Sequence, residues 1–385
     1  MDRREHKSIS LVYEFLSEQG GLEREIINHA NFLKQAGYHV QVLTCYLDKK
    51  LLELLPFQGI TIKEISTFKT PWEAVNLILC FFGFNNLKKI KSDAFLSYSA
   101  PCNFLLRNNK GKKINYINHF PHFLYLNKKE KIEWASSTKG LKRWISVILS
   151  WFLGSILKKT DMSLVKKNNL NFVNSNFTKK TIESIYMIKT LVSYPPIDPQ
   201  FKPVQTNKTK EKYIFSSSRI IPDKKYEWVI EALSFTKNKL PLYVAGSVEP
   251  EYKNKLINLA YKQGVRLVFL GKLKTESIRE YYSNAECFVF PAPGEDFGLV
   301  PAESLACGTP CIVWVDNAGP TEQVKEGING YLAKPYDTKD FARKIDICLD
   351  SNFKKKNRKL ILESAKKFSA EEVKKDFIKK INSLF

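Results

Sequence analysis

The stretch Gly294-Glu295-Asp296-Phe297-Gly298-Leu299-Val300-Pro301-Ala302-Glu303 carries two glutamates eight positions apart, with a Phe-Gly turn between them. A buried-strand pattern over residues 285–291 precedes it, and an apolar, helix-like run follows from residue 304. The order strand, glycine loop, helix directs backbone N–H groups and a helix N-terminus toward one place, which favours a bound phosphate. The carboxylates suit sugar or ribose hydroxyls, because a carboxylate accepts charge-assisted hydrogen bonds.

A simpler interpretation makes Glu295 a solvated loop charge and Glu303 a carboxylate favoured by the helix dipole. The residues that follow argue against it. Gly308-Thr309-Pro310 leads into a second strand pattern over residues 311–315, and Asn317–Glu322 forms another glycine loop ending in an acidic residue. The repeated strand, loop and helix pattern predicts a βα rim, where ligands bind in parallel sheets.

The pattern Glu295-x-Phe-Gly-Leu-x-x-x-Glu303, followed by Ala306, Gly308 and Pro310, resembles the E-x7-E motif of retaining glycosyltransferases of the GT-B class, family 4. The resemblance implies an α/β fold with two facing Rossmann-like domains and an interdomain cleft. It also implies a GDP- or UDP-linked sugar as co-substrate and no separate cofactor. The sequence contains no Asp-x-Asp motif, so we expect no metal-bridged diphosphate and stabilisation by cations and a helix dipole instead.

Length and composition agree with a globular protein of two domains. The chain has 385 residues, of which 44% are hydrophobic and 26% charged. Its seven cysteines show no C-x-x-C pair and all five histidines precede residue 123, so we expect no structural zinc and a reducing compartment. The N-terminal residues lack the apolar core of a signal peptide, which predicts a cytoplasmic protein.

A proline-rich break at Tyr194–Pro199, with a polar stretch after it, marks the expected domain boundary. We therefore expect an N-terminal, acceptor-side domain over residues 1–198 and a C-terminal, donor-binding domain over residues 199–369. By resemblance, the last helix, at about residues 370–385, packs back on the first domain.

The first domain opens with a strand over residues 8–15, a loop, a helix over residues 22–36 and a strand over residues 40–44. This is Rossmann-like, but it lacks G-x-G-x-x-G, so a dinucleotide site is weakly indicated. The resemblance assigns Gly20 and Gly21 to close backbone approach to the donor diphosphate, whereas their simpler role is a tight turn. Further on, Thr70-Pro71-Trp72-Glu73 predicts a capping box that opens an apolar helix over residues 74–84.

His119 follows a strand pattern over residues 114–117, in the run Asn118-His119-Phe120-Pro121-His122. The carboxyl end of a parallel strand is where ligands bind in such sheets, and the resemblance assigns a donor-sugar contact to this histidine. Family mannosyltransferases that act on lipid-linked sugars often show His-Phe-Pro followed by an aspartate. Here His122 stands in place of the aspartate, which weakens the inference of mannose.

Two cations, Arg219 and Lys224, lie on the loop after a strand pattern over residues 213–217. Such a pair can neutralise a leaving diphosphate, and the resembled family has an arginine and a lysine at this spacing. The family usually has glycine after the lysine, where this chain has Lys225, so the tight turn is in doubt. A solvated basic loop is the simpler alternative.

The resemblance completes a candidate site. It assigns catalytic roles to His119, Arg219, Lys224 and Glu295, with Glu295 on the sugar hydroxyls. It assigns Glu303 to the ribose hydroxyls, and it gives the remaining donor contacts, to diphosphate and base, to Phe297, Gly298, Leu299, Lys272 and Leu273. No covalent nucleophile is identified.

Basic charge is concentrated in the first domain. The net charge is +22, and residues 86–167 hold 17 basic and four acidic residues, which attracts an anionic surface. Within this segment the apolar run Trp144–Leu157 would form a helix about 21 Å long, too short for a hydrocarbon core of roughly 30 Å. We expect it either to lie against the cytoplasmic leaflet or to be a fully buried helix. The candidate membrane contacts are Lys142, Arg143, Trp144, Trp151, Phe152, Lys158 and Lys159.

These features predict a hexosyltransferase, with mannose as the first sugar to test, that acts with retention. A lipid-linked or cell-envelope glycan at the cytoplasmic face of the membrane is the expected acceptor. The alternatives are a nucleotide-sugar epimerase of the same fold and a non-catalytic nucleotide-sugar-binding subunit. A nucleic-acid partner is not expected, because the aromatic residues fall in apolar runs and are not interleaved with the basic ones.

Overall fold

The computed structural model describes residues 7–17, 20–48, 57, 59–98, 100–136, 141–204 and 211–385, except the side chains of residues 141 and 142. The chain forms two compact units. The first contains residues 1–194 together with 374–385, and the second contains residues 195–373. Each unit is built around its own parallel sheet, and each is described below by itself.

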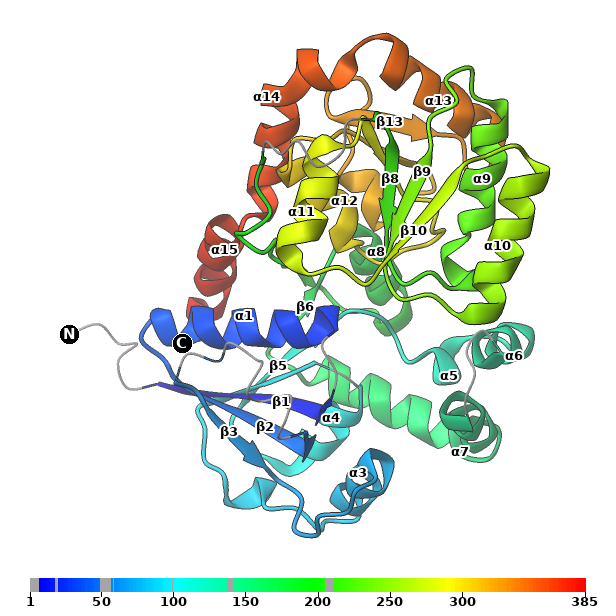
Figure 1. Ribbon diagram of the computed structural model, residues 1–385. Helices are drawn as coiled ribbons and strands as arrows, with labels where there is room; N and C mark the ends of the chain where they lie inside the picture. The colour runs from blue at the N-terminus through cyan, green and yellow to red at the C-terminus, as the bar shows by residue number, and fades with distance from the viewer. Residues whose placement is uncertain are drawn as a thin grey trace. The chain divides into compact units, whose positions relative to one another are not determined.

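The first unit has a seven-stranded sheet in the order β3-β2-β1-β4-β5-β6-β7, with every neighbouring pair parallel (Figure 1). Its central strands are apolar on both faces, because helices cover both sides of such a sheet. The strands are β1 (Ser8–Leu16), β2 (His39–Leu47), β3 (Thr61–Glu64), β4 (Ala94–Ser97), β5 (Lys112–Ile117), β6 (Leu170–Val173) and β7 (Leu191–Val192).

Helices cover this sheet on both sides. Figure 1 shows α1 (Gly21–Gln35) on one side and α3 (Glu73–Phe81) on the other. Helix α3 packs beside α4 (Ala100–Leu105), which packs against the long helix α7 (Leu141–Lys166). The remaining helices are α5 (His122–Tyr125), α6 (Lys128–Ser136), α8 (Asn176–Tyr186) and the short turns η1 (Leu87–Lys89) and η2 (Leu106–Asn108).

The end of the chain packs within the first unit. Helix α15 (Ala370–Asn382) stacks the Phe377 ring on buried His29, with centroids 4.2 Å apart. The Tyr38 hydroxyl donates a 2.7 Å hydrogen bond to the side-chain oxygen of Asn382. A stacked buried ring and a long-range hydrogen bond hold residues 374–385 to the first sheet's helices.

The second unit has a six-stranded parallel sheet in the order β10-β9-β8-β11-β12-β13. The strand order reverses between β8 and β11, and ligands bind outside the carboxyl ends of strands at such a point. The strands are β8 (Ile214–Ser217), β9 (Leu242–Ala245), β10 (Leu267–Gly271), β11 (Cys287–Val289), β12 (Cys311–Trp314) and β13 (Gly330–Ala333).

The helices of the second unit alternate with these strands, as the sequence pattern predicts. They are η3 (Pro222–Lys224), α9 (Tyr226–Phe235), α10 (Pro250–Lys262), α11 (Thr275–Asn284), α12 (Leu299–Ala306), η4 (Gly319–Glu322), α13 (Thr338–Asp350), α14 (Phe353–Ala365) and η5 (Lys366–Phe368). Two doubly wound sheets with the strand order 3-2-1-4-5-6 confirm the predicted α/β class of two Rossmann-like units. That the units face each other across a cleft stays a prediction.

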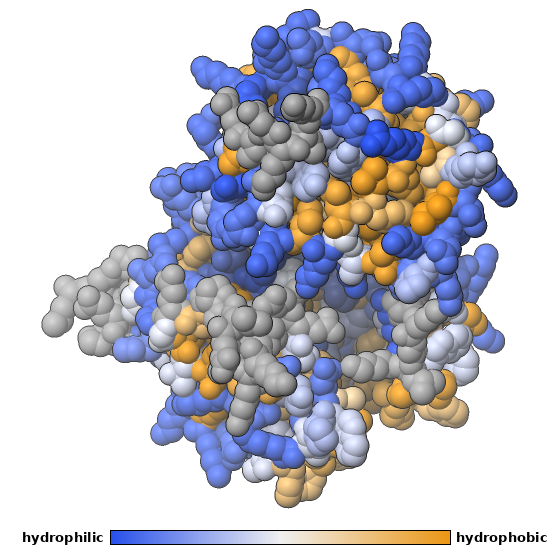
Figure 2. Space-filling view, viewed as in Figure 1, coloured by the Kyte–Doolittle hydropathy of each residue, from blue (hydrophilic) through white to orange (hydrophobic). Residues whose placement is uncertain are grey.

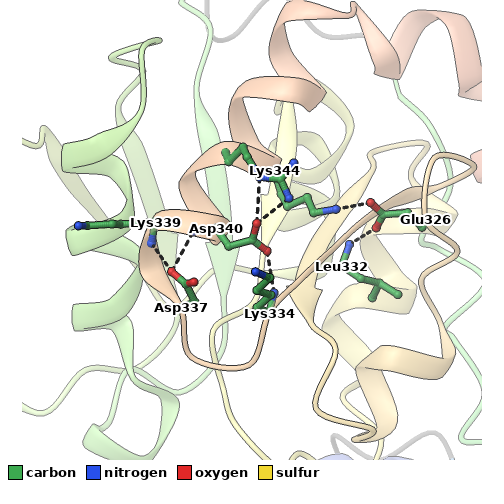
Figure 3. Close-up of polar contacts among 8 residues, drawn as sticks. Glu326, Leu332, Lys334, Asp337, Lys339, Asp340 and Lys344 are labelled. Atoms are coloured by element: carbon green, nitrogen blue, oxygen red, sulfur yellow. Dashed lines mark hydrogen bonds and ion pairs between the residues drawn. The ribbon is translucent and has the colours of Figure 1, made fainter.

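The turn from β13 into α13 illustrates how local chemistry fixes these connections (Figure 3). The Asp337 carboxylate caps α13 by accepting hydrogen bonds from the backbone N–H groups of Lys339 (3.1 Å) and Asp340 (3.0 Å). The Asp340 carboxylate in turn accepts the backbone N–H of Lys334 at 2.8 Å. A missing cap of this kind costs about 1 kcal/mol, so the sequence determines where α13 begins.

The predicted capping box at Thr70 is wrong. Helix α3 begins at Glu73, and the residue at its N-cap, Trp72, makes no side-chain cap. The Thr70 hydroxyl instead donates to the Asn76 side-chain oxygen at 2.9 Å and accepts the Trp72 backbone N–H at 3.3 Å. Asn76, buried within the helix, competes for the threonine and draws it into a side-chain turn.

Of the two alternatives for Trp144–Leu157, a helix against the membrane or a fully buried helix, the structure rules out full burial. Helix α7 extends beyond that run at both ends, and its apolar residues Ile145, Phe152 and Ile156 are 61%, 81% and 65% exposed. Only one stripe turns inward, including the buried residues Val147 and Ser150. Among the helices that the structure describes, none combines the length and the apolar character that crossing a bilayer requires.

The candidate membrane contacts on α7 differ in their surroundings. Trp151 is 53% exposed, and Phe152, Lys158 and Lys159 are exposed as well. Trp144 is half-buried. Arg143 is half-buried too: its guanidinium donates to the Trp134 carbonyl at 2.8 Å and lies 4.9 Å from that ring's centroid. It therefore packs α7 on α6. Lys142 lies outside the described side chains.

Candidate active site

The rim of the second sheet brings Lys224 and Glu295 together. Lys224 ends the turn η3 after β8, and Glu295 lies on the loop between β11 and α12. Their side chains form an ion pair and hydrogen bond, and they are 17% and 25% exposed. Partial burial shields this pair from solvent, so its mutual attraction exceeds that of a surface pair.

Lys225 supplies the tight turn that the missing glycine put in doubt. Its backbone adopts the left-handed conformation, with φ 52° and ψ 44°, and α9 begins at the next residue. Glycine takes this conformation without a steric penalty, whereas a side chain costs about 1 kcal/mol or more. The tight turn therefore forms and positions Lys224, although the left-handed backbone of Lys225 is strained.

Gly298 gives α12 its entry angle. It is the N-cap residue, with φ 73° and no side-chain cap. A Cβ atom there would lie 3.2 Å from the Pro320 side chain and 3.3 Å from Cγ of Glu295. The first N–H groups of a helix, here starting at Leu299, have no partner within the helix. The rim thus combines a cation, a carboxylate and a helix N-terminus.

Gln323 holds this loop, and sequence reasoning missed it. Its side-chain amide donates to the carbonyls of Phe297 at 2.6 Å and Gly298 at 2.9 Å. The Gly319 backbone N–H donates to the Glu295 carbonyl at 2.8 Å. Because these contacts go to backbone carbonyls, no residue type in the loop signals them. The buried Phe297 ring packs in the core and meets the Phe368 ring edge-on, with centroids 5.4 Å apart.

Glu303 is buried on α12. The Tyr282 hydroxyl donates to its carboxylate at 3.2 Å and also lies 2.6 Å from the Ser217 hydroxyl, at the end of β8. This chain of hydrogen bonds orients the carboxylate relative to the strand that precedes the Lys224 loop. A role of Glu303 on ribose stays a prediction.

Asp296, between the two predicted glutamates, is a second group that sequence reasoning left without a role. Partial burial, reinforced by the Glu295 carboxylate, raises the pKa of Asp296 to about 7, while Lys224 acts in the opposite direction. Lys224 can balance one negative charge, whereas Glu295 and Asp296 would carry two if both were ionised. At neutral pH Asp296 can carry or release a proton.

The other predicted donor contacts lie on neighbouring loops of the same rim. Arg219 follows β8 and is exposed, and Lys272 follows β10 and is also exposed. Leu273 is half-buried beside Lys272. Within the described residues, no hydrogen bond or ion pair joins these three to Lys224 or Glu295.

The predicted residues of the first unit lie at the carboxyl edge of its sheet. Gly20 caps α1, and its backbone N–H donates to the Glu23 carboxylate at 3.0 Å, with Gly21 as the first helical residue. His119 follows β5 and is exposed, and its ring lies 5.4 Å from that of His122. The structure thus has His119 directly after the carboxyl end of β5, and its contact with a donor sugar stays a prediction.

A buried carboxyl lies behind the His119 loop. Glu25 on α1 accepts a 3.3 Å hydrogen bond from the Asn118 side chain. Burial raises the pKa of Glu25 to about 8, and hydrogen bonds with Tyr116 and Asn118 offset the rise only in part. Glu25 is thus protonated at neutral pH. Sequence reasoning assigned Glu25 no role, because a glutamate in a helix pattern is expected at the surface, whereas this one is buried.

Comparison with known proteins identifies the second unit. Residues 198–368 match the family model of glycosyl transferases group 1. The matched residues include the Lys224–Glu295 ion pair, the N-terminus of α12 and Glu303.

Relatives extend the similarity. An uncharacterized glycosyltransferase of Methanocaldococcus jannaschii is 32% identical over 175 residues, covering 44% of this chain and 43% of that protein. A serotype-specific mannosyltransferase of Escherichia coli is 29% identical over 185 residues, covering 45% of this chain and 22% of that protein. The chain thus aligns with less than half the length of these curated relatives.

Solved structures extend the fold similarity over the whole chain. The Anabaena protein HepE in complex with UDP-glucose aligns with a TM-score of 0.72 and 15% identity, covering 98% of this chain and all of that one. At that identity the likeness shows the fold alone. Together with the two sheet topologies, it places the chain in the GT-B fold.

Proposed function

We propose that the protein is a glycosyltransferase that transfers a hexose from a nucleotide-sugar to an acceptor hydroxyl with retention of configuration. The observation that carries the proposal is the Lys224–Glu295 pair beside the N-terminus of α12. A nucleotide-sugar offers the matching groups in one molecule. Its diphosphate suits a cation and helix N–H groups, and its sugar hydroxyls suit a carboxylate.

The residues then act as follows. The bond between the anomeric carbon and the diphosphate oxygen breaks, and the oxygen keeps the electron pair. Lys224, Arg219 and the first N–H groups of α12 stabilise the negative charge on the leaving diphosphate, so the scheme requires no metal ion. The acceptor oxygen bonds to the anomeric carbon and passes its proton to the oxygen of the leaving diphosphate.

Carboxylates hold the donor in this scheme. Glu295 accepts hydrogen bonds from the sugar hydroxyls, and Glu303, oriented by Tyr282, accepts those of the ribose. His119 contacts the donor sugar, and Lys272 and Leu273 contact the base. The mannosyltransferase relative makes mannose the first sugar to test, and the UDP-glucose bound to HepE makes UDP-linked donors the first alternative to GDP-linked ones.

The acceptor that we propose is lipid-linked or part of a cell-envelope glycan, at the cytoplasmic face of the membrane. Support comes from α7, whose apolar side chains are exposed between basic residues. Such a helix suits the headgroup region of an anionic leaflet. We call its exposed apolar residues the α7 face: Ile145, Ile148, Leu149, Trp151, Phe152, Leu153 and Ile156.

The test is sugar transfer to extracted lipid. Purified protein is incubated with labelled nucleotide-sugars and detergent-solubilised membrane lipids, and the label in the lipid phase is counted. We expect one donor to give labelled lipid, and Lys224→Ala to abolish the label, while the control Lys262→Ala on an exposed turn of α10 keeps it. The anomeric configuration of the product, read by NMR, tests retention. No transfer from any donor, or full activity of Lys224→Ala, contradicts the proposal.

A further inference from the structure

A second exposed apolar surface lies on the first unit, between β3 and β4. Ser66 and Asn85 pair as an antiparallel bridge and close this segment at its base. Phe68 and Phe84 meet there, with ring centroids 5.4 Å apart. Helix α3 lies between the two ends. We call the segment's exposed apolar side chains the α3 patch: Phe68, Trp72, Val75, Ile78, Phe82 and Phe84.

The α3 patch is distinct from the core face of its helix. Leu77 and Phe81 point inward and pack on the buried cluster that includes Cys80. Trp72 and Phe82 point outward and are 67% and 78% exposed. The helix thus has a core side and, in addition, an apolar outer side. Large exposed apolar patches of this kind mark binding surfaces.

The α3 patch and the α7 face belong to one side of the unit. Helix α3 packs beside α4, and α4 packs against α7. Figure 1 shows α3 on the side of the sheet opposite α1, and Figure 2 shows apolar atoms at the outer edge of this unit. Helices α3, α4 and α7 thus form one contiguous row.

Basic residues border the α3 patch. The exposed Arg107 donates to the Phe81 carbonyl at 3.5 Å, at the end of α3, and to the Phe104 carbonyl at 2.8 Å. Further exposed cations follow α3 and α4 along the chain: Lys88, Lys89, Lys91, Lys110 and Lys112. Apolar side chains beside Arg107, in a part of the chain rich in exposed cations, complement an anionic lipid surface.

The acidic residues of this region do not cancel its charge at the surface. Asp93 accepts the backbone N–H and hydroxyl of Ser8 and pairs with Lys7 at 3.6 Å. Asp161 is buried and accepts the hydroxyls of Tyr125 and Tyr186 at 2.8 and 2.6 Å. Nearer the patch, Glu64 pairs with Lys69 at 2.7 Å, and Glu73 lies in the first turn of α3. The positive charge comes from the segment that follows α3, since residues 86–167 hold 17 basic and four acidic residues.

We propose that the α3 patch is a second membrane contact, which inserts its aromatic side chains into the headgroup region of an anionic bilayer beside the α7 face. Two separate contacts prevent rotation about α7 and so fix the orientation of the first unit on the bilayer. This inference rests on the proposed function, which places the acceptor at a membrane. A second copy of the chain fits the patch less well, because an isologous contact would oppose two basic rims.

The test is co-sedimentation of the full chain with vesicles. Vesicles of phosphatidylglycerol and phosphatidylcholine in equal parts are compared with pure phosphatidylcholine. The variant Trp72→Glu/Phe82→Glu removes the α3 contact, and Trp151→Glu/Phe152→Glu removes the α7 contact. The control Tyr261→Ser changes an aromatic residue of the second unit that is 88% exposed. If a glutamate pair prevents folding, as shown by its melting curve, the corresponding serine pair replaces it.

We expect wild type to bind the anionic vesicles and the α3 variant to bind about tenfold more weakly, since it loses the burial of two aromatic side chains. The control should bind like wild type. Wild-type binding by a folded α3 variant overturns the inference. Conversion of a dimer to a monomer by the α3 variant, with vesicle binding unchanged, overturns it in favour of a second copy. If no nucleotide-sugar supports transfer, the proposed function is contradicted. The vesicle measurement still decides by itself whether the α3 patch contacts a bilayer.

Discussion

In the second unit, Lys224, Glu295 and Gly298 lie on loops that are tied to one another, whereas in the first unit Trp72 and Phe152 lie on the outer faces of helices. In the second unit the loops are tied by hydrogen bonds to backbone carbonyls and by a glycine where a larger residue would be strained and crowded. In the first unit the side chains of Trp72 and Phe152 are 67% and 81% exposed. A substitution at the rim should therefore alter several groups together, while one on a helix face should act locally.

The largest expected effect tests the rim chemistry. Glu295→Gln keeps the size of the side chain but removes the charge that pairs with Lys224 and accepts sugar hydroxyls. We expect sugar transfer to slow by about a hundredfold, the scale of a lost charge-stabilising group in an active site. The control Glu276→Gln changes an exposed glutamate of α11. Equal rates of sugar transfer for the two variants would show that Glu295 takes no part in the reaction.

Two glycine substitutions distinguish backbone strain from steric crowding. Gly298→Ala adds a Cβ to a left-handed residue against Pro320 and Glu295, and Gly264→Ala adds one at φ 63° with no atom within 4 Å. Strain alone costs about 1–2 kcal/mol, so urea unfolding should show at least that loss for both. We expect Gly298→Ala to lose more stability and also to lose activity. Equal losses of stability in the two variants would mean that the neighbours of Gly298 make room for the added Cβ at no measurable cost.

The first unit provides a pH test through Glu25. Burial raises the pKa of Glu25 to about 8, above the value near 4.3 of an unfolded chain. Between these two values the folded state holds a proton that the unfolded state has lost, so stability falls as pH rises toward 8. We expect the melting temperature of Glu25→Gln to fall less than that of wild type between about pH 5 and pH 8. If the melting temperatures of wild type and Glu25→Gln fall equally as pH rises, the Glu25 carboxyl behaves as one exposed to water.

The smallest expected effect concerns Lys225. Lys225→Gly relieves a left-handed residue but raises the entropy of the unfolded chain, so the net gain in stability should be at most about 1 kcal/mol. Urea unfolding measures it. A marked loss of stability would indicate that the Lys225 side chain, whose ammonium lies 5.8 Å from the Trp228 ring centroid, contributes more than its backbone costs.

Sequence patterns predicted most of the fold, because apolar periodicity and glycine loops reflect local physics. They located β8 and α1 to within one residue. They failed where a side chain can take one of several partners and the fold decides which. The capping box was wrong because Asn76 takes the Thr70 hydroxyl, and the burial of the Trp144–Leu157 run was open because composition does not say which side of a helix meets the core. Gln323 and Glu25 were missed because their partners lie 25 or more residues away.

The most direct measurement of the central claim is the shift in melting temperature that nucleotide-sugars cause. A ligand that binds only the folded state raises its melting temperature. Wild type and Lys224→Ala are each heated with a panel of UDP- and GDP-linked sugars, with Lys262→Ala as the control. We expect one nucleotide-sugar to raise the melting temperature of wild type and of the control, and to have little effect on Lys224→Ala. Equal shifts in all three proteins, or no shift with any nucleotide-sugar, would contradict it.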